Sequence, residues 1–360
     1  MNKQNNIAKI LSQYSYIFVF LIILVGYAMT IISNGNSFTF KHVATIMSSQ
    51  QTSIIGTVAL GMAFVIITGQ IDLSVGSSLV LTMGACITVF NLTDSIILML
   101  LTAVVVGALC GLINGLLVGI CKMPPFVVTL GTMLIYRSIT LTLVRSIDKS
   151  ITGSGSGLFQ MISKDHKQYT AARMKFGGGS LKLGSFSIPW IFFVFLAMAV
   201  LFIVIAKHTK YGKSIYAVGS NEKSARLAGI NVTGVKISVF VLTGVCVGVA
   251  SFLQACKMSN VNPASSCQSY EMYAIASVVL AGVNMAGGRG NLLGVIFGAM
   301  SYATINFIIN NVGLSVDIQP AFQGLVLIVV ILIQTVGPVI KESIRLGKRR
   351  RSAVREGRNG

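Results

Sequence analysis

Charged residues are scarce in this sequence, and acidic ones are the scarcest. Only 10% of the 360 residues are Asp, Glu, Lys or Arg, and nine are acidic, whereas a soluble domain carries about 25% charged residues. Proline occurs six times and histidine three times, and no Cys/His pair has the spacing of a zinc site. The composition excludes a disordered or disulfide-stapled protein and argues against a soluble enzyme.

Apolar residues and glycine are abundant instead. Hydrophobic residues make up 54% of the chain, glycine occurs 37 times, and the mean hydropathy is +0.80. A membrane-spanning helix needs about 20 apolar residues, and glycine lets neighbouring helices approach closely. We therefore expect an all-α fold, a polytopic bundle of about ten membrane-spanning helices. The expected spans are residues 15–33, 51–69, 74–91, 95–120, 126–145, 188–206, 236–256, 272–287, 291–311 and 319–340.

The 28 basic residues predict how the spans are oriented, because Lys and Arg concentrate in cytoplasmic loops. With the N-terminus inside, 18 basic residues fall on the inner side, nine on the outer side and one, Arg137, within a span. Both termini are therefore expected in the cytoplasm. No small-residue cleavage site follows the first apolar run, so we expect it to stay as a helix. Because the basic residues flank apolar runs, their expected partner is the lipid bilayer and not nucleic acid.

Three parts are predicted along the chain. Residues 1–14 form a cytoplasmic N-terminal segment, residues 15–340 the transmembrane domain, and residues 341–360 a basic cytoplasmic tail. Two hydrophilic insertions interrupt the transmembrane domain. They are an outer loop at 146–187, which contains Gly and Ser runs, and an inner loop at 207–234.

Glycines recur every four residues in three of the expected spans. Residues i and i+4 share one face of a helix, so each series predicts a groove for a neighbouring helix. The series are Gly107, Gly111, Gly115 and Gly119; Gly244 and Gly248; and Gly290, Gly294 and Gly298. They indicate a tightly packed bundle and carry no chemistry.

The sequence contains no catalytic pattern. Gly212-Lys213-Ser214 resembles the end of a phosphate-binding loop, but Lys207 stands where that loop requires a glycine. Asp72 is the one acidic residue expected at depth, and carriers coupled to protons or sodium usually need buried ionisable groups. We therefore expect that the chain is not an enzyme, holds no cofactor or metal of its own, and takes its energy from elsewhere.

Three side chains are left with two interpretations each. Arg137 lies in the fifth span, past the midplane by helical rise. It is either a functional charge or an arginine that anchors the outer interface. Cys256 and Cys267 flank one expected outer loop and either form a disulfide or stay free.

Two stretches of the chain resemble each other. Residues 65–69, Val-Ile-Ile-Thr-Gly, are echoed by residues 278–282, Val-Val-Leu-Ala-Gly, and a turn follows each. Six expected spans separate the copies, so both turns are predicted on the same side of the membrane. Internal repeats often flank the substrate path of transporters. The alternative is that two glycine-rich hairpins agree by composition alone.

The inner loop carries the signal of a short helix. Ser220 or Asn221 can cap its start, Glu222 lies in its first turn, and Gly229 can end it. The expected helix, from Glu222 to Ala228, has about two turns, and an isolated helix of that length is not stable in water. The transmembrane domain or a cytoplasmic partner must therefore hold it.

Several motifs, taken in order, resemble one family. Residues 69–76, Gly-Gln-Ile-Asp-Leu-Ser-Val-Gly, are similar to the signature turn of permease subunits of ABC importers for monosaccharides, of the ribose, xylose and galactoside type. The resemblance covers nearly the whole chain, residues 15–340. Its further motifs are Asn114-Gly115, residues 124–132 (Pro-Pro-Phe-Val-Val-Thr-Leu-Gly-Thr), Tyr211-Gly212, residues 217–222 (Ala-Val-Gly-Ser-Asn-Glu), Ala225, Gly229-Ile230 and residues 287–290 (Gly-Gly-Arg-Gly).

The resemblance implies a helical permease of a prokaryotic plasma (inner) membrane that works as a pair, with a second copy or a paralogue. A separate ATPase subunit, holding ATP and Mg, drives such a permease, and an extracytoplasmic sugar-binding protein feeds it. The family's coupling helix, which docks in a cleft of the ATPase, is resembled by Asn221, Glu222, Ala225, Arg226 and Gly229. The open alternatives are an ABC permease for a nucleoside, a signalling furanose or an amino acid, and a self-sufficient secondary carrier.

Two more sets of residues complete the expected site. Amides and aromatic rings commonly hold sugars, and the expected path residues are Gln70, Asp72, Asn114, Phe126, Asn284, Asn306 and Gln323. The outer loop carries seven basic residues from Arg145 to Lys182 against two acidic ones, and such a surface steers an acidic partner. The residues expected to dock the binding protein are Lys164, Lys167, Arg173 and Lys175. The alternative for this loop is a flexible, solvated segment.

Overall fold

The structure is a computed structural model, and it describes residues 15–162, 166–183, 186–313, 318, 321–325, 328, 329, 332 and 336. The chain divides into two compact units, Met1–Ile308 and Ile309–Gly360. Residues 321–325 of the second unit are helical. The contacts that position the functional site lie in the first unit.

Seven helices of the described residues are long and apolar enough to cross a membrane. They are α2 (Ser15–Ser33), α5 (Val75–Thr93), α6 (Ile96–Gly119), α7 (Pro125–Ser146), α10 (Trp190–His208), α13 (Val232–Met258) and α15 (Leu292–Asn311). A bent pair gives an eighth span if counted as one: α3 (Phe40–Ser48) meets η1 (Gln51–Ile55) and α4 (Gly56–Ile67) at 50°. The apolar α14 (Tyr270–Leu280) has only 11 residues.

The expected helical membrane bundle is confirmed, with three differences in its spans. The span expected at 51–69 is η1 with α4, which ends at Ile67 and crosses a membrane only as a bent pair with α3. The span expected at 272–287 is α14, which ends at Leu280. Gly282 adopts a φ of +80° beyond that end and turns the chain out of the helix. The span expected at 319–340 lies mostly outside the described residues. The cytoplasmic placement of both termini stays a prediction.

The short helix α4 lies at the centre of the first unit. All 12 of its residues are buried, and it packs against α10, α13 and α14. Phe64 of α4 stacks on Phe202 of α10, with ring centroids 5.1 Å apart. A helix that is apolar on every face needs such surroundings, because each face must be covered.

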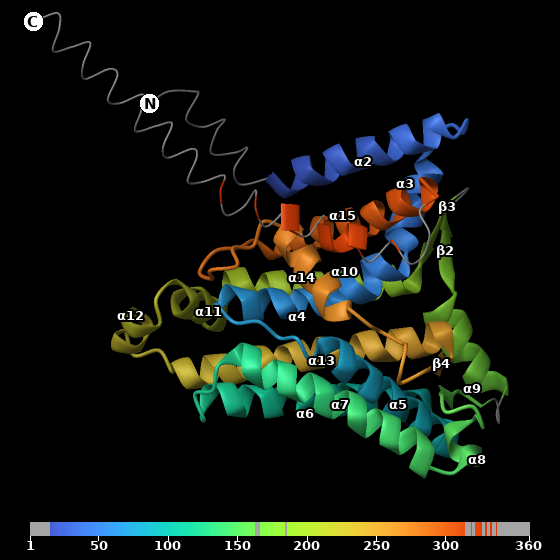
Figure 1. Cartoon of the computed structure of the whole chain (residues 1–360), viewed down its shortest axis with the longest axis horizontal. Coiled ribbons are helices and arrows are strands. Elements are labelled where there is room, and N and C mark those ends of the chain that lie inside the picture. Colours follow the sequence, from blue (N-terminus) through green and yellow to red (C-terminus); the bar gives the residue numbers. More distant parts are fainter. Residues whose placement is uncertain are drawn as a thin grey trace, which may run out of the picture. The chain divides into compact units, whose positions relative to one another are not determined.

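The predicted glycine seams are confirmed as sites of close backbone approach. A Cβ atom on Gly107 would overlap the Gly244 carbonyl of α13, and one on Gly111 would overlap the Phe240 carbonyl. On α15, a Cβ atom on Gly298 would overlap a carbonyl of α14. α6 and α13 therefore lie against each other along most of their length (Figure 1).

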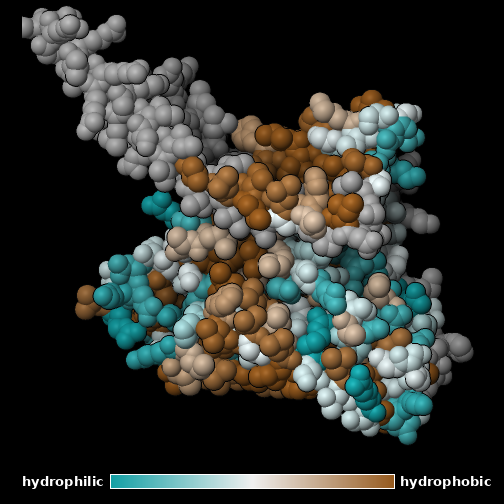
Figure 2. Space-filling model, in the orientation of Figure 1, coloured by the Kyte–Doolittle hydropathy of each residue, from teal (hydrophilic) through white to brown (hydrophobic). Residues whose placement is uncertain are grey.

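Two short helices, α11 (Lys210–Ser220) and α12 (Glu222–Leu227), project from one end of the bundle, called here the α12 end (Figure 1). The opposite end carries β4 (Asn260–Val261) and is called the β4 end. Figure 2 shows hydrophilic surface gathered over α11 and α12 and again towards the β4 end, with hydrophobic surface over the helices between them. This pattern is typical of a membrane protein whose two ends are in contact with water.

The segment expected as an outer loop, 146–187, is more structured than a loop. Its described residues form α8 (Lys149–Thr152), β1 (Phe159–Gln160), α9 (His166–Ala171), η2 (Ala172–Gly177), β2 (Ser180–Leu183) and the start of β3 (Phe186–Pro189). β2 and β3 form an antiparallel hairpin, and β1 pairs antiparallel with β4. Asn91 at the end of α5 donates from Nδ2 to the carbonyls of Ile151 and Gln160, both at 2.8 Å. The segment is therefore anchored to α5 and to the α13–α14 connection.

Candidate functional site

The helices α4 and α14 end in the same local structure. After α4, Gly69 has a φ of +77°, its amide donates to the Ile66 carbonyl, and the next amide donates to the Val65 carbonyl. After α14, Gly282 has a φ of +80° and the same two bonds reach Val279 and Val278. These are the paired bonds of a Schellman cap, which needs a left-handed residue. The echo in the sequence is thus a repeated helix ending, at the positions predicted.

The turns that follow these two helix ends touch each other. The Gly288 amide of the second turn donates to the Ile67 carbonyl at the end of α4, at 2.8 Å. Gly69 and Gly287 lie so close that a Cβ atom on Gly287 would stand 3.0 Å from the Gly69 nitrogen. Both turns therefore lie on the same side of the first unit, as the sequence predicts.

Helix α11 packs directly on this pair of turns. A Cβ atom on Gly219 would overlap the Ile67 carbonyl, so α11 and the α4 end are in backbone contact. The Tyr216 hydroxyl donates to the Gly290 carbonyl at 3.0 Å, beyond the second turn. α11 thus touches both the end of α4 and the turn that follows α14.

Helix α12 follows α11 after a single residue. Asn221 ends α11 and caps α12, with its Oδ1 accepting from the Ser224 amide at 2.9 Å. Ala225 is buried and anchors the helix. Gly229, at a φ of +78°, ends it with the same paired bonds as the two buried helix ends. The predicted helix at 222–228 is confirmed to within one residue.

Helix α12 carries its ion pairs on one face. Glu222 lies 2.9 Å from Lys236 of α13 and 3.4 Å from Arg226. The hydrogen bond from Lys236 lowers the pKa of Glu222 below its ordinary value. Lys223 and Leu227 lie together on another face, since they are four residues apart, and Leu227 is 90% exposed. Leu227 is the one large apolar side chain of this six-residue helix.

Two expected path residues, Asp72 and Asn114, are joined in one buried cluster. Asp72 is 3% exposed, and its Oδ1 accepts from the Ser74 amide at 2.8 Å and the Ser74 hydroxyl at 2.7 Å. The Asn114 Nδ2 group donates to the same hydroxyl at 2.8 Å. The Asn114 Oδ1 and the Gln70 Oε1 are buried and accept no bond from any described residue. The cluster therefore has one spare acceptor, the Asn114 Oδ1, and Gln70, two residues before Asp72, carries another.

The other four expected path residues differ in burial and in the element that carries them. Phe126 is 55% exposed in the first turn of α7. Asn284 is exposed, and its Oδ1 accepts from the Ala286 amide within the second turn. Asn306 is buried and donates to a carbonyl one turn earlier in α15. Gln323 lies in the second compact unit. Their role in a path stays a prediction.

Arg137 acts as a clamp near the β4 end. Its Nη1 donates to the carbonyls of Pro263 at 2.8 Å and Ser266 at 2.9 Å, both in the α13–α14 connection. The guanidinium is therefore held by the protein, and both interpretations of Arg137 stay predictions. Cys256 and Cys267 are both buried and free, so the alternative of a disulfide between them is wrong.

The four residues expected to dock a binding protein are only partly described. Lys164 lies outside the described residues, and Lys167 lies in α9, where its side chain is not described. Arg173 and Lys175 are exposed in η2. The Arg173 guanidinium lies over the Tyr169 ring, 5.9 Å from its centroid. Docking therefore stays a prediction.

Tyr216 and Leu227 of this site were not singled out from the sequence, and Gly219 was quoted only as part of the motif at 217–222. Tyr216 and Gly219 take part through contacts with chain more than 70 residues away, which no local pattern reveals. Leu227 has a weak signal, because it is the only large apolar residue from Asn221 to Gly229.

A family model described as "Branched-chain amino acid transport system / permease component" matches residues 44–331. The chain belongs to this family. The ribose import permease protein of Bacillus subtilis (strain 168) is 35% identical to this permease over 285 residues, 79% of the chain and 82% of the relative. That of Escherichia coli (strain K12) is 32% identical over 316 residues, 87% of the chain and 91% of the relative. The galactose/methyl galactoside import permease of the same organism is 28% identical over 324 residues, 86% and 91% of the two chains.

No solved structure matches the permease. The resemblance of its motifs to ABC-importer permeases is confirmed by these relatives. The contacts at the α12 end therefore belong to a multi-pass membrane subunit of a transport system.

Proposed function

We propose that the permease imports a monosaccharide, as one of a pair of membrane subunits in the plasma (inner) membrane of a prokaryote. Relatives named for ribose, xylose, fructose and galactose import support a sugar as the solute. The observation that carries the transport mechanism is the contact of α11 with the end of α4 and with the turn that follows α14. Unusually short apolar helices in corresponding positions often flank the substrate path of a transporter.

In this proposal the α12 end faces the cytoplasm, and α12 docks on a separate ATPase subunit through Lys223 and Leu227. ATP and Mg belong to that ATPase, and the permease has no ATPase site of its own. Movement of α12 reaches α11 through one residue, Asn221. Because Gly219 leaves no gap against the α4 end, α11 cannot move without moving both turns.

The buried cluster then serves as a transit site for sugar hydroxyls. The Asn114 Oδ1 and the Gln70 Oε1 each have capacity to accept a hydrogen bond that no described residue uses. A buried acceptor left unpaired costs about 1–3 kcal/mol. A passing hydroxyl relieves that cost, which suits weak and temporary binding. At the β4 end, an extracytoplasmic binding protein delivers the sugar.

The test of the solute is uptake by proteoliposomes that contain the permease, its ATPase and its binding protein. Ribose, xylose, fructose and galactose are offered separately as labelled solutes, with leucine as the competitor that the family description suggests. We expect ATP-dependent uptake of at least one monosaccharide and none of leucine. Uptake of leucine with no uptake of any sugar would contradict the proposal.

A further inference from the structure

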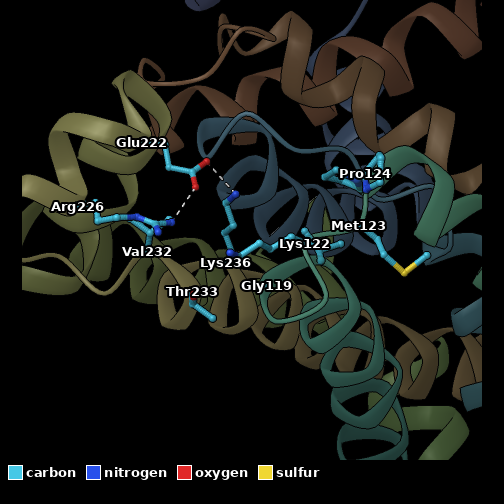
Figure 3. A pocket seen from close by; sticks show the side chains of 11 residues that line it. Gly119, Lys122, Met123, Pro124, Glu222, Arg226, Val232, Thr233 and Lys236 are labelled. Atoms are coloured by element: carbon cyan, nitrogen blue, oxygen red, sulfur yellow. Dashed lines mark hydrogen bonds and ion pairs between the residues drawn. The ribbon is translucent and has the colours of Figure 1, made fainter.

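A basic cleft lies beside α12, at the junction of three elements. Its volume is about 260 Å3, and its walls come from the end of α6, the α6–α7 turn, α12 and the start of α13. The charged side chains that line it are Lys122, Glu222, Arg226 and Lys236. Figure 3 shows Glu222 reaching towards the two cations that it pairs with, and Lys122 on the adjacent α6–α7 turn.

The charge of the cleft is not balanced by the protein that surrounds it. Three cations against one carboxylate leave a net charge of +2. Glu222 already contacts Arg226 and Lys236. Lys122 forms no ion pair with any residue that the structure describes. The cleft therefore has room and charge for an anion.

The surface next to the cleft is apolar. Met123, which also lines the cleft, is 40% exposed, and Ile120, Phe126 and Val127 are between 54% and 60% exposed. These residues end α6 and begin α7, two of the helices long enough to span a membrane. A ligand that fits both features has an anionic head and an apolar tail.

We propose that this cleft binds the headgroup phosphate of an anionic phospholipid of the cytoplasmic leaflet, with the acyl chains along the exposed ends of α6 and α7. Basic pockets between membrane helices on the cytoplasmic side are suited to such headgroups. The cleft uses the Glu222 and Arg226 face of α12, which leaves the Lys223 and Leu227 face open for the ATPase. An acidic side chain of the ATPase is the competing occupant, but it does not account for the apolar rim.

The experiment measures lipid binding by the full-length permease, first alone and then with the ATPase added. The detergent-purified chain is titrated with phosphatidylglycerol or phosphatidylcholine, and bound lipid is counted by native mass spectrometry. We expect a preference for phosphatidylglycerol that weakens about fivefold in Lys122→Gln, which corresponds to about 1 kcal/mol per lysine. Lys122→Arg keeps the preference. The matched control, Lys213→Gln, removes the same charge from an exposed position on α11 and has no effect.

Results of three kinds would overturn the proposal. The first is equal binding of the two lipids, or equal loss in the Lys122 and Lys213 variants. The second is full competition by free glycerol phosphate, which would make the cleft a site for soluble phosphates. The third is loss of bound phosphatidylglycerol when the ATPase is added, which would assign the cleft to the ATPase. The lipid proposal rests on the proposed function in placing the α12 end in the cytoplasm, and sugar uptake is measured separately, so failure of one is distinguishable from failure of the other.

Discussion

Removing the Leu227 side chain should weaken binding of the ATPase without disturbing the permease itself. Leu227 is 90% exposed, so Leu227→Ala removes almost no packing within the chain. Its effect on the stability of the permease should stay within about 0.5 kcal/mol, as for other surface substitutions.

The effect on the complex is much larger if Leu227 is buried against the ATPase. Leu→Ala removes three carbons, and each buried methylene contributes about 0.8 kcal/mol. Allowing for incomplete burial, the loss is about 2 kcal/mol, which corresponds to a dissociation constant roughly 30 times higher. Uptake should fall in parallel when the ATPase is limiting.

The assay is the affinity of the ATPase for the permease in nanodiscs, with thermal unfolding measured on the same samples. Leu92→Ala is the matched control, since Leu92 is 56% exposed but lies in the last turn of α5, away from the α12 end. An unchanged affinity in Leu227→Ala, or an equal loss in both variants, would refute the assignment of this face of α12.

Three further predictions follow from the contacts of the first unit. Gly219→Ala should uncouple ATP hydrolysis from uptake, because the added Cβ atom overlaps the end of α4. The control Gly131→Ala, whose Cβ atom meets open space, should transport normally, and equal transport by both variants would contradict the link through α11. Gly111→Leu should reduce the folded yield in fluorescence-detected size exclusion, because the larger side chain separates α6 from α13. Ala108→Leu, on a half-exposed face, should reduce the yield less, and similar yields for the two variants would contradict the close packing of α6 on α13. The pKa of Glu222 is lowered in the folded protein. Its ion pairs therefore stabilise the α12 end fully at a pH above the ordinary pKa of the carboxylate, and this stabilisation is lost as the pH falls through the lowered pKa. Hydrogen exchange in α12 should therefore rise in acid for the wild type but not for Glu222→Gln, and an identical pH response in the two proteins would contradict it.

Apolar runs were sufficient to predict most of the helices, because a membrane span has to be apolar over its whole length. The same rule made one span too long. The apolar run after α14 continues through Ala281 and Val283, and hydropathy does not register that Gly282 turns the chain at a positive φ. The start and end of α12 were predictable because capping residues act locally.

Contacts between distant parts of the chain were not predictable in the same way. β1 pairs with β4 across about 100 residues, and neither two-residue strand has a pattern of its own. The link from Asp72 through Ser74 to Asn114 depends on how α5 and α6 pack. Sequence named both ends of that link from residue type but not the serine between them.

The most direct test of the central claim, that ATP hydrolysis drives solute through this permease by way of α12, compares two energy sources in one preparation. Proteoliposomes with the permease, the ATPase and the binding protein receive labelled sugar with ATP, or with an imposed proton or sodium gradient and no ATP. The account predicts uptake with ATP and none with either gradient. Uptake driven by a gradient without ATP would contradict it and would identify a secondary carrier.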